Sequence, residues 1–354
     1  MTDSPSYRLG VDVGGTFTDF VLLDESDREI HIAKSLTTPA DPSVGILTGV
    51  QAFDANCAGH IEATRRIAHA TTLVANSVIE RKGAVTALLT TKGFRDILEL
   101  RRHVRVTTYE LFADPPEPLV PRWLRLPVEE RVFSDGVVLK AVQREDIERA
   151  VEVIRAENVT SVAIAFLHSY VNPENEQAAA AYLKELMPNI AVTMSSDVLP
   201  QIKEFERTST TVVNGYVKPL AQQYLANLDG GLQSNGYKAP LHIMLSNGGL
   251  GSTTTAGNFP IRLIESGPVA GAIVGRQLAE LMGQPGPEPL RPPALPRSRR
   301  PPPGASARPG CARPSESWTR RRAASSSARG TSRRSRTFEA REASPAGPGS
   351  ARPP

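Results

Sequence analysis

Hydrophobic and polar positions follow two periods along the first 284 residues. Apolar runs rich in β-branched residues, or alternating with period two, predict strands at 7–13, 17–23, 29–35, 66–70, 84–90, 159–167, 190–195, 242–245 and 262–265. Apolar residues spaced three and four apart, with capping residues, predict helices at 42–53, 71–81, 144–157, 173–186, 205–217, 220–228 and 267–282, and a helical turn at 93–98. Residues 100–140 contain five prolines after position 114 and are expected to be irregular. Strands that alternate with helices predict an α/β protein with mixed sheets.

The composition changes abruptly near residue 285. Residues 285–354 contain 15 Pro and 15 Arg but no Ile, Val or Lys, and carry a formal charge of +11, whereas residues 1–284 carry −7. Such a segment cannot bury an apolar core and is expected to be a disordered tail. The mildly acidic remainder gives no indication of nucleic-acid or membrane binding.

Other features limit the class of protein. The N-terminal residues lack the basic segment and apolar stretch of a signal peptide, and the longest apolar runs have the length of strands, so a cytoplasmic protein without a membrane segment is expected. The two cysteines, Cys57 and Cys311, lie on opposite sides of the break in composition and cannot build a metal site.

The segment 10–19, Gly-Val-Asp-Val-Gly-Gly-Thr-Phe-Thr-Asp, carries the most specific local pattern. A strand runs into Gly14 and Gly15, and glycines without a Cβ let a phosphate approach the backbone. Successive N–H groups in such a turn form an anion-binding concavity, to which Thr16 and Thr18 can add hydrogen bonds. Asp12 is placed to hold magnesium. The alternative is an ordinary Gly-Gly hairpin with polar flanks.

This turn resembles the first phosphate motif of the actin, sugar kinase and heat-shock ATPase superfamily. The following segments resemble one branch of it, the A subunit of the hydantoinase/5-oxoprolinase family. The matching stretches, in family order, are HATT at 69–72, ERKG at 80–83, LLTTKGFRDILELRR at 88–102, SYVNPENEQ at 169–177, EFERTSTTVVNGYVKP at 204–219, LSNGG at 245–249 and ESGPVAGA at 265–272. The resemblance implies a ribonuclease H-like ATPase lobe with a mixed sheet.

The resemblance also implies an activity. The family opens a five-membered cyclic amide or imide, such as 5-oxoproline or a hydantoin, at the expense of ATP with magnesium. Transfer of the γ-phosphoryl group to the resonance-stabilised carbonyl would create a leaving group. Relatives are subunits of ATP-dependent ketone carboxylases of the acetone or acetophenone type, which is the alternative reaction. The family's A subunit usually works with a B-type subunit, so such a partner and a small cyclic amide substrate are expected.

Several further residues become candidates through the resemblance. Thr71, Thr72 and Asn76 at a strand-to-helix junction are candidates for catalysis, or for capping the helix. The turn of Asn247, Gly248 and Gly249, and the helix start at Ser266 and Gly267, are candidates for binding the nucleotide. Together with Asp12 as catalytic and metal residue, the nucleotide site is expected to include Gly14, Gly15, Thr16, Thr18 and Asp19. His69 is the one histidine suspected of chemistry.

The chain departs from the family after residue 284. The family continues there into a second Asp-Gly-Gly-Thr-type phosphate loop, and residues 285–354 contain none. We therefore expect three parts: an ATPase lobe at 1–200, the truncated start of the hydantoinase A core domain at 201–284, and the tail at 285–354. An out-of-frame read of a GC-rich gene explains the tail's composition, and implies an incomplete second lobe and no activity for the chain alone. The alternative is an inactive fragment whose native basic tail binds nucleic acid.

Overall fold

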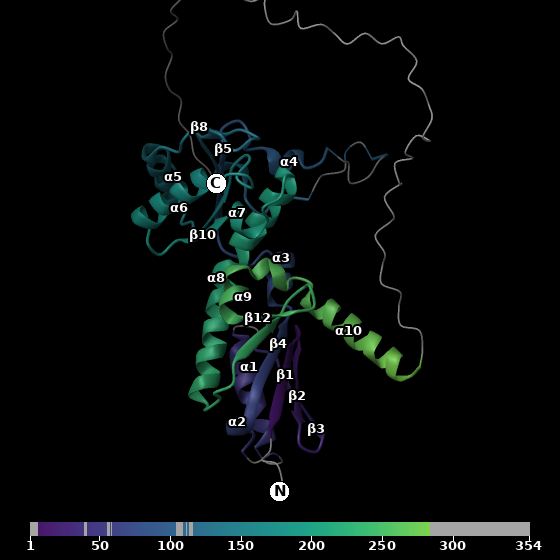
Figure 1. The fold of residues 1–354 in the computed structure, drawn as a ribbon. Helices are drawn as coiled ribbons and strands as arrows, with labels where there is room; N and C mark the ends of the chain where they lie inside the picture. The colour runs from purple at the N-terminus through teal and green to yellow at the C-terminus, as the bar shows by residue number, and fades with distance from the viewer. Residues whose placement is uncertain are drawn as a thin grey trace, which may run out of the picture. The chain divides into compact units, whose positions relative to one another are not determined.

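The computed structural model describes residues 6–38, 41–54, 57, 59–103, 109–110, 112 and 116–283. The predicted tail lies outside these residues. The frameshift and nucleic-acid hypotheses depend on that tail and therefore lie outside them as well. Two sheets organise the described chain, and each has its own hydrophobic core. A mixed α/β architecture, as the sequence predicts, is therefore confirmed (Figure 1).

The first sheet has six strands in the order β12-β11-β4-β1-β2-β3. β1, β2 and β3 form an antiparallel meander, while β4 lies parallel to β1 and β11 lies parallel to β4. The strands are β1 (Tyr7–Val13), β2 (Phe17–Asp24), β3 (Ile30–Leu36), β4 (Thr64–Thr71), β11 (Leu241–Met244) and β12 (Leu250–Ser252). Every second residue of β1, from Tyr7 to Val13, is buried in the first core, so one face of this sheet is covered.

The second sheet has four parallel strands in the order β10-β9-β5-β6. They are β5 (Thr86–Thr91), β6 (Arg125–Val128), β9 (Ser161–Ala165) and β10 (Ala191–Met194), and a hairpin of β7 (Arg131–Val132) and β8 (Val138–Lys140) follows β6. Every residue of β5 and of β9 is buried, as expected for central strands of a parallel sheet that is covered on both faces.

The helices cover these sheets and connect them. They are α1 (Pro42–Gly49), α2 (His60–Ala63), α3 (Leu73–Ile79), α4 (Ile97–Leu100), α5 (Arg144–Ala156), α6 (Glu174–Leu186), α7 (Ser195–Val198), α8 (Glu204–Ser234), α9 (Thr253–Asn258) and α10 (Ser266–Leu281), with 3-10 turns at Val50–Phe53, Arg122–Leu124 and Pro260–Leu263. Asp41 caps α1, because its Oδ1 accepts a hydrogen bond of 3.0 Å from Ser43 N. The amphipathic α5 buries Ile147, Val151 and Ile154.

The two helices predicted at 205–217 and 220–228 are one. α8 runs through Pro219 and contacts β9 and β10 of the second sheet as well as α1, α3 and α9 (Figure 1). Proline has no N–H to bond the carbonyl four residues earlier, that of Gly215. The hydroxyl of Ser161 in β9 donates to this oxygen at 2.7 Å instead. The helix continues because the second sheet supplies the missing donor.

Two further expectations were wrong. Residues 262–265 are not a strand, because Pro260 begins a 3-10 turn at Pro260–Leu263, and proline's fixed φ favours the first turn of a helix. The stretch 100–140 is not wholly irregular, since it contains β6, β7 and β8. Pro127 is tolerated within β6 because this strand lies at the edge of its sheet.

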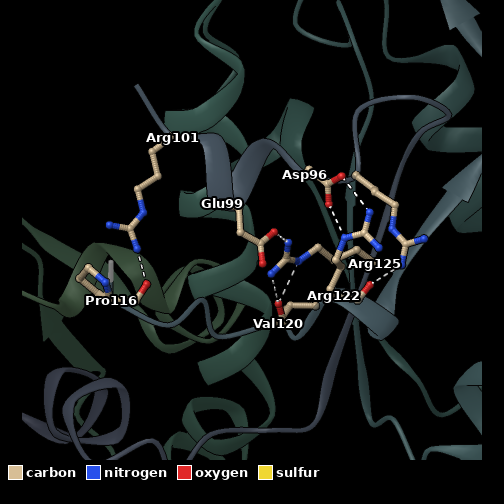
Figure 2. Close-up of polar contacts among 8 residues, drawn as sticks. Asp96, Glu99, Arg101, Pro116, Val120, Arg122 and Arg125 are labelled. Atoms are coloured by element: carbon tan, nitrogen blue, oxygen red, sulfur yellow. Dashed lines mark hydrogen bonds and ion pairs between the residues drawn. The ribbon is translucent and has the colours of Figure 1, made fainter. Parts of the chain in front are cut away.

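Arginines hold the start of β6 against α4 (Figure 2). Arg125 is almost fully buried, donates to Val120 O at 3.0 Å and 2.9 Å through Nε and Nη2, and pairs with Glu99. Arg122 donates two hydrogen bonds to Asp96, at 2.7 Å and 3.0 Å, and these bonds lower the pKa of the Asp96 carboxyl. Planar guanidinium groups suit such two-pronged contacts, so these pairs order a segment in which the sequence shows no regular pattern.

Candidate functional site

The Gly-Gly turn connects β1 and β2 at the end of the first sheet. Gly14 N donates to Phe17 O at 3.0 Å and closes the turn. Thr37 holds it from the side of β3, with its Oγ1 donating to Gly14 O at 3.0 Å and its N donating to Thr16 O at 2.9 Å. Thr37 carries no local signal in the sequence, because it meets the turn only through strand pairing.

A cavity of about 250 Å³ opens beside this turn. Four predicted residues line it together: Gly14, Gly15, Thr72 and Asn76. A Cβ built on Gly15 would meet only Asn76 Nδ2, at 4.0 Å, so the backbone of Gly15 is open to the cavity. This opening is the geometry that close approach of a phosphate to a glycine backbone requires.

α3 presents a connected set of polar groups to the cavity. Asn76 Nδ2 donates to Thr72 Oγ1 at 3.1 Å, and Thr72 Oγ1 donates to Val13 O at 3.4 Å. These two hydrogen bonds connect the N-terminus of α3 to the C-terminal end of β1. Thr71 precedes the N-cap residue Thr72; it is buried, and its hydroxyl accepts a hydrogen bond of 3.1 Å from Leu73 N. The structure therefore brings Thr72 and Asn76 to the cavity, while Thr71 has a structural contact.

The far end of α3 adds two charged residues. Glu80 and Lys82 line the same cavity and form an ion pair of 2.7 Å with each other. In the sequence they stand at a polar helix end, a pattern that is typical of a solvated surface. Only the chain reversal after α3 brings Lys82 toward the cavity, and lysine is a common phosphate ligand.

Asp12 and Asp19 lie on the opposite face of the sheet from the buried residues of β1 and β2. They are directly opposed in the register of the two strands. Surrounding atoms that partly shield Asp12 from water, and then the negative charge of Asp19, raise the pKa of the Asp12 carboxyl. Asp19 has a counter-charge in Lys34 at 2.9 Å. Neither aspartate lines the cavity, so the predicted metal residue and the glycine turn face different sides of the hairpin.

Most of the remaining predicted residues make contacts within the protein. Thr18 is fully buried and bonded to Thr37 Oγ1 at 3.1 Å, whereas Thr16 is exposed. Asn247 Oδ1 accepts from Gly249 N at 2.9 Å within a turn where Gly248 has a φ of 84°. Ser266 is buried, with its hydroxyl donating to Thr71 O at 3.4 Å, and Gly267 has open space around it. None of these residues lines the cavity.

His69 is structural, which corrects the suspicion raised from its sequence position. It is buried, its Nδ1 donates to Val11 O at 3.2 Å, and the hydroxyl of Tyr224 in α8 donates to its Nε2 at 2.7 Å. Burial lowers the pKa of His69 to about 4, so the ring is neutral. Both nitrogens are thus used to join β4, β1 and α8.

Among the described residues, no group of three or more His, Cys, Asp or Glu side chains is placed to hold a metal ion. No helix within the same part of the chain has both the length and the apolar character needed to cross a membrane.

The chain belongs to the hydantoinase/oxoprolinase family. It matches that family's N-terminal region over residues 8–187 and its hydantoinase/oxoprolinase region over residues 207–285. The resemblance deduced from the motifs is therefore confirmed.

Named relatives include an uncharacterized protein of Methanocaldococcus jannaschii, with 38% identity over 279 residues, and the caprolactamase subunit alpha of Pseudomonas jessenii, with 35% identity over 283 residues. Each match covers 78% of this chain and 40% of the relative, so the chain spans less than half the length of either protein.

Two solved structures share the fold. The nucleotide-free structure of an acetone carboxylase matches with a TM-score of 0.72 at 28% identity, over 79% of this chain and 41% of that one. The ATP-dependent caprolactamase of Pseudomonas jessenii matches with a TM-score of 0.70 at 35% identity, over 78% of this chain and 41% of that one. The fold expected from the sequence, that of this family's ATPase lobe, is therefore confirmed.

Proposed function

We propose that the chain is the phosphate-binding portion of an ATP-dependent enzyme that opens a cyclic amide ring. The observation that carries the proposal is the unshielded backbone of Gly15 in a cavity shared with Thr72, Asn76 and Lys82. Backbone N–H groups and a lysine are the donors that a nucleotide phosphate needs. Membership of the hydantoinase/oxoprolinase family and the likeness to an ATP-dependent caprolactamase support the reaction class.

The chemistry asks mainly for positioning and neutralisation of charge. Amide resonance makes a lactam carbonyl a poor electrophile, and phosphorylation of its oxygen would expose the carbon to water. In this scheme the Gly14–Gly15 turn holds the transferred phosphoryl group, and Lys82 balances part of its charge. Asn76, whose amide is oriented by Thr72, is within the same cavity to orient the ring carbonyl.

Asp12 and Asp19 fit the role of magnesium ligands. Like charges directly opposed across two strands destabilise the pair, and an oxygen-seeking cation would relieve that repulsion. Magnesium commonly takes one or two carboxylates together with substrate phosphates and water, so a larger cluster of side chains is not required. Asp12→Asn is expected to raise the magnesium concentration needed for half-maximal nucleotide binding, and an unchanged magnesium requirement would contradict the assignment.

We also propose that the chain works beside a partner subunit of the B type. Its relatives include a caprolactamase subunit alpha, an acetophenone carboxylase gamma subunit and an acetone carboxylase beta subunit, and those names describe multi-subunit enzymes. The intact parent protein is expected to co-purify with a larger B-type subunit. A solitary protein that opens hydantoin or oxoproline rings unaided would contradict this.

A second candidate reaction is ATP-dependent carboxylation of a ketone. It is favoured by the likeness to the acetone carboxylase structure and by 31% identity to the acetophenone carboxylase gamma subunit of Aromatoleum aromaticum. Assays of the co-purified complex decide between the two. Phosphate release that depends on hydantoin, 5-oxoproline or caprolactam supports ring opening, whereas release that depends on a ketone together with bicarbonate supports carboxylation.

A further inference from the structure

The second sheet has a point where its connections change direction. β5 is followed in the chain by β6 on one side, and β9 is followed by β10 on the other side. β5 and β9 are themselves neighbours, with Thr90 opposite Ala165 in the register. In open parallel sheets, ligands bind beyond the carboxyl ends of the strands at such a point. The residues that follow Thr91 and Ala165 therefore lie where such a sheet binds a ligand.

A buried arginine lies at this edge with an unused donor. Arg207 of α8 is only 1% exposed, and its Nη1 donates to Ser169 Oγ. Its Nε has no hydrogen-bond partner among the described residues. A buried charged group normally has its donors satisfied, because leaving one unpaired costs free energy. Arg207 thus keeps one unpaired N–H, among the described residues, at the edge where a ligand is expected.

The neighbouring carboxylate cannot satisfy it. Glu176 is fully buried and accepts from Phe166 N at 3.0 Å, Ser195 Oγ at 2.6 Å and Ser196 N at 2.9 Å. Arg207 reaches Glu176 only through two hydroxyls, since Ser169 Oγ lies 3.0 Å from Ser195 Oγ. The Glu176 carboxylate accepts its hydrogen bonds from the groups that follow β9 and β10, and the Nε–H of Arg207 has no partner among the described residues.

His168 carries a second unpaired group, and both His168 and Arg207 lie near the ring of Tyr170. His168 follows β9 with a φ of 58°, a conformation that non-glycine residues adopt at a cost and that is found at functional sites. Its Nδ1 is buried and, within the described part of the chain, has no hydrogen-bond partner. The His168 ring lies 6.0 Å from that of Tyr170, and the guanidinium of Arg207 lies 5.5 Å from the Tyr170 ring.

We propose that this edge is a second binding site, in which Arg207 and His168 hold a small oxyanion of the carboxylate or phosphate type. Such an oxyanion accepts hydrogen bonds from a guanidinium N–H and an imidazole N–H, and burial strengthens hydrogen bonds to charged groups. Tyr170 and His168 are partly exposed at this edge, while the two unpaired nitrogens themselves are buried. The site is separate from the Gly14–Gly15 cavity, and the inference does not depend on the proposed function.

Calorimetric titration of the full chain with inorganic phosphate, and separately with acetate, at constant ionic strength tests the site. Saturable binding of one of them is expected, and the anion with the higher affinity identifies the oxyanion class. His168→Gly removes the imidazole and, because glycine tolerates positive φ, should fold with an unchanged or higher Tm. It should weaken binding at least about tenfold, the usual scale for losing a charge-assisted hydrogen bond. Arg207→Met should abolish binding if it folds.

Gly15→Val is the control, because it blocks the other cavity and should leave this binding unchanged. The proposal is overturned if the unmodified chain shows no saturable binding of either anion, or if His168→Gly binds as tightly as the unmodified chain. Anion binding that Gly15→Val removes and His168→Gly retains also overturns it. That result would assign the anion to the Gly14–Gly15 cavity and would leave the proposed function standing.

Discussion

The hydroxyl of Ser161 donates a hydrogen bond of 2.7 Å to the carbonyl oxygen of Gly215, the oxygen that Pro219 leaves without its helical partner. This bond joins β9 of the second sheet to the middle of α8. Since the C-terminal half of α8 contributes Tyr224, Leu225 and Leu228 to the first core, one helix connects both cores. The relation between the cavity and the second sheet therefore depends on an uninterrupted α8.

Replacing Ser161 tests that dependence. Ser161→Ala should lower the free energy of unfolding by about 1–3 kcal/mol, the cost of a buried unsatisfied carbonyl. In the Pro219→Ala background the same change should cost less, because alanine restores an N–H to Gly215 O. Chemical denaturation of the four proteins measures this coupling. Equal costs in the two backgrounds would show that the hydroxyl does not replace the helical donor.

The pair of His69 and Tyr224 predicts a response to acid. Because the pKa of His69 falls from 6.5 to about 4 on folding, the unfolded chain binds a proton that the folded chain does not. Its stabilising contribution is present above pH 6.5 and is lost as the pH falls toward 4. His69→Gln, which cannot titrate, should flatten the dependence of unfolding free energy on pH in that window. The same slope in both proteins would contradict the buried neutral histidine.

Tyr224→Phe tests the same contact without removing the histidine. It should cost about 1–2 kcal/mol, because His69 Nε2 loses its buried donor. Tyr216→Phe is the matched control, since Tyr216 is a buried tyrosine of the same helix. Thermal unfolding should separate the two variants. A loss at Tyr216 as large as that at Tyr224 would attribute the effect to general packing.

The sequence predicted what depends on local pattern. The alternation in β1, the Asp41 cap and the amphipathic α5 follow from residues close together in the chain, and the structure has them. Prediction from sequence failed where a residue far away in the chain determines the local structure. Pro219 indicates a break unless Ser161 is known to face Gly215, and Pro127 argues against a strand unless β6 is known to be an edge.

The candidate site divides in the same way. Gly14, Gly15, Thr72 and Asn76 were expected from motifs and share one cavity. Thr37 reaches the turn through the meander, and Lys82 reaches the cavity through the chain reversal after α3, so neither could be found from spacing. For Asp12 the motif was misleading in the opposite way, because closeness in sequence did not bring it to the cavity. Its place in the motif is next to the turn, but alternation along β1 directs it to the other face of the sheet.

The break in composition at residue 285 gives a prediction about the coding DNA. The match to the hydantoinase/oxoprolinase region ends at residue 285, where the Pro- and Arg-rich stretch begins. Translation of the other two reading frames downstream of codon 284 should restore an Asp-Gly-Gly-Thr-type segment within a few dozen codons. If neither frame contains one, the stretch is native, and its binding to nucleic acid should be tested by salt-dependent association.

Nucleotide binding by Gly15→Val tests the central claim most directly. A Cβ at Gly15 meets only Asn76 Nδ2, at 4.0 Å, so the fold should tolerate the change while the branched side chain fills the space in front of the backbone. Gly230→Ala, at a position in α8 where a Cβ would meet no other atom, is the control. Calorimetric titration with ATP and magnesium should show binding to the unmodified chain and the control, and at least about a tenfold loss for Gly15→Val at unchanged Tm. Equal affinity in all three proteins, or no binding to the unmodified chain, would contradict the account.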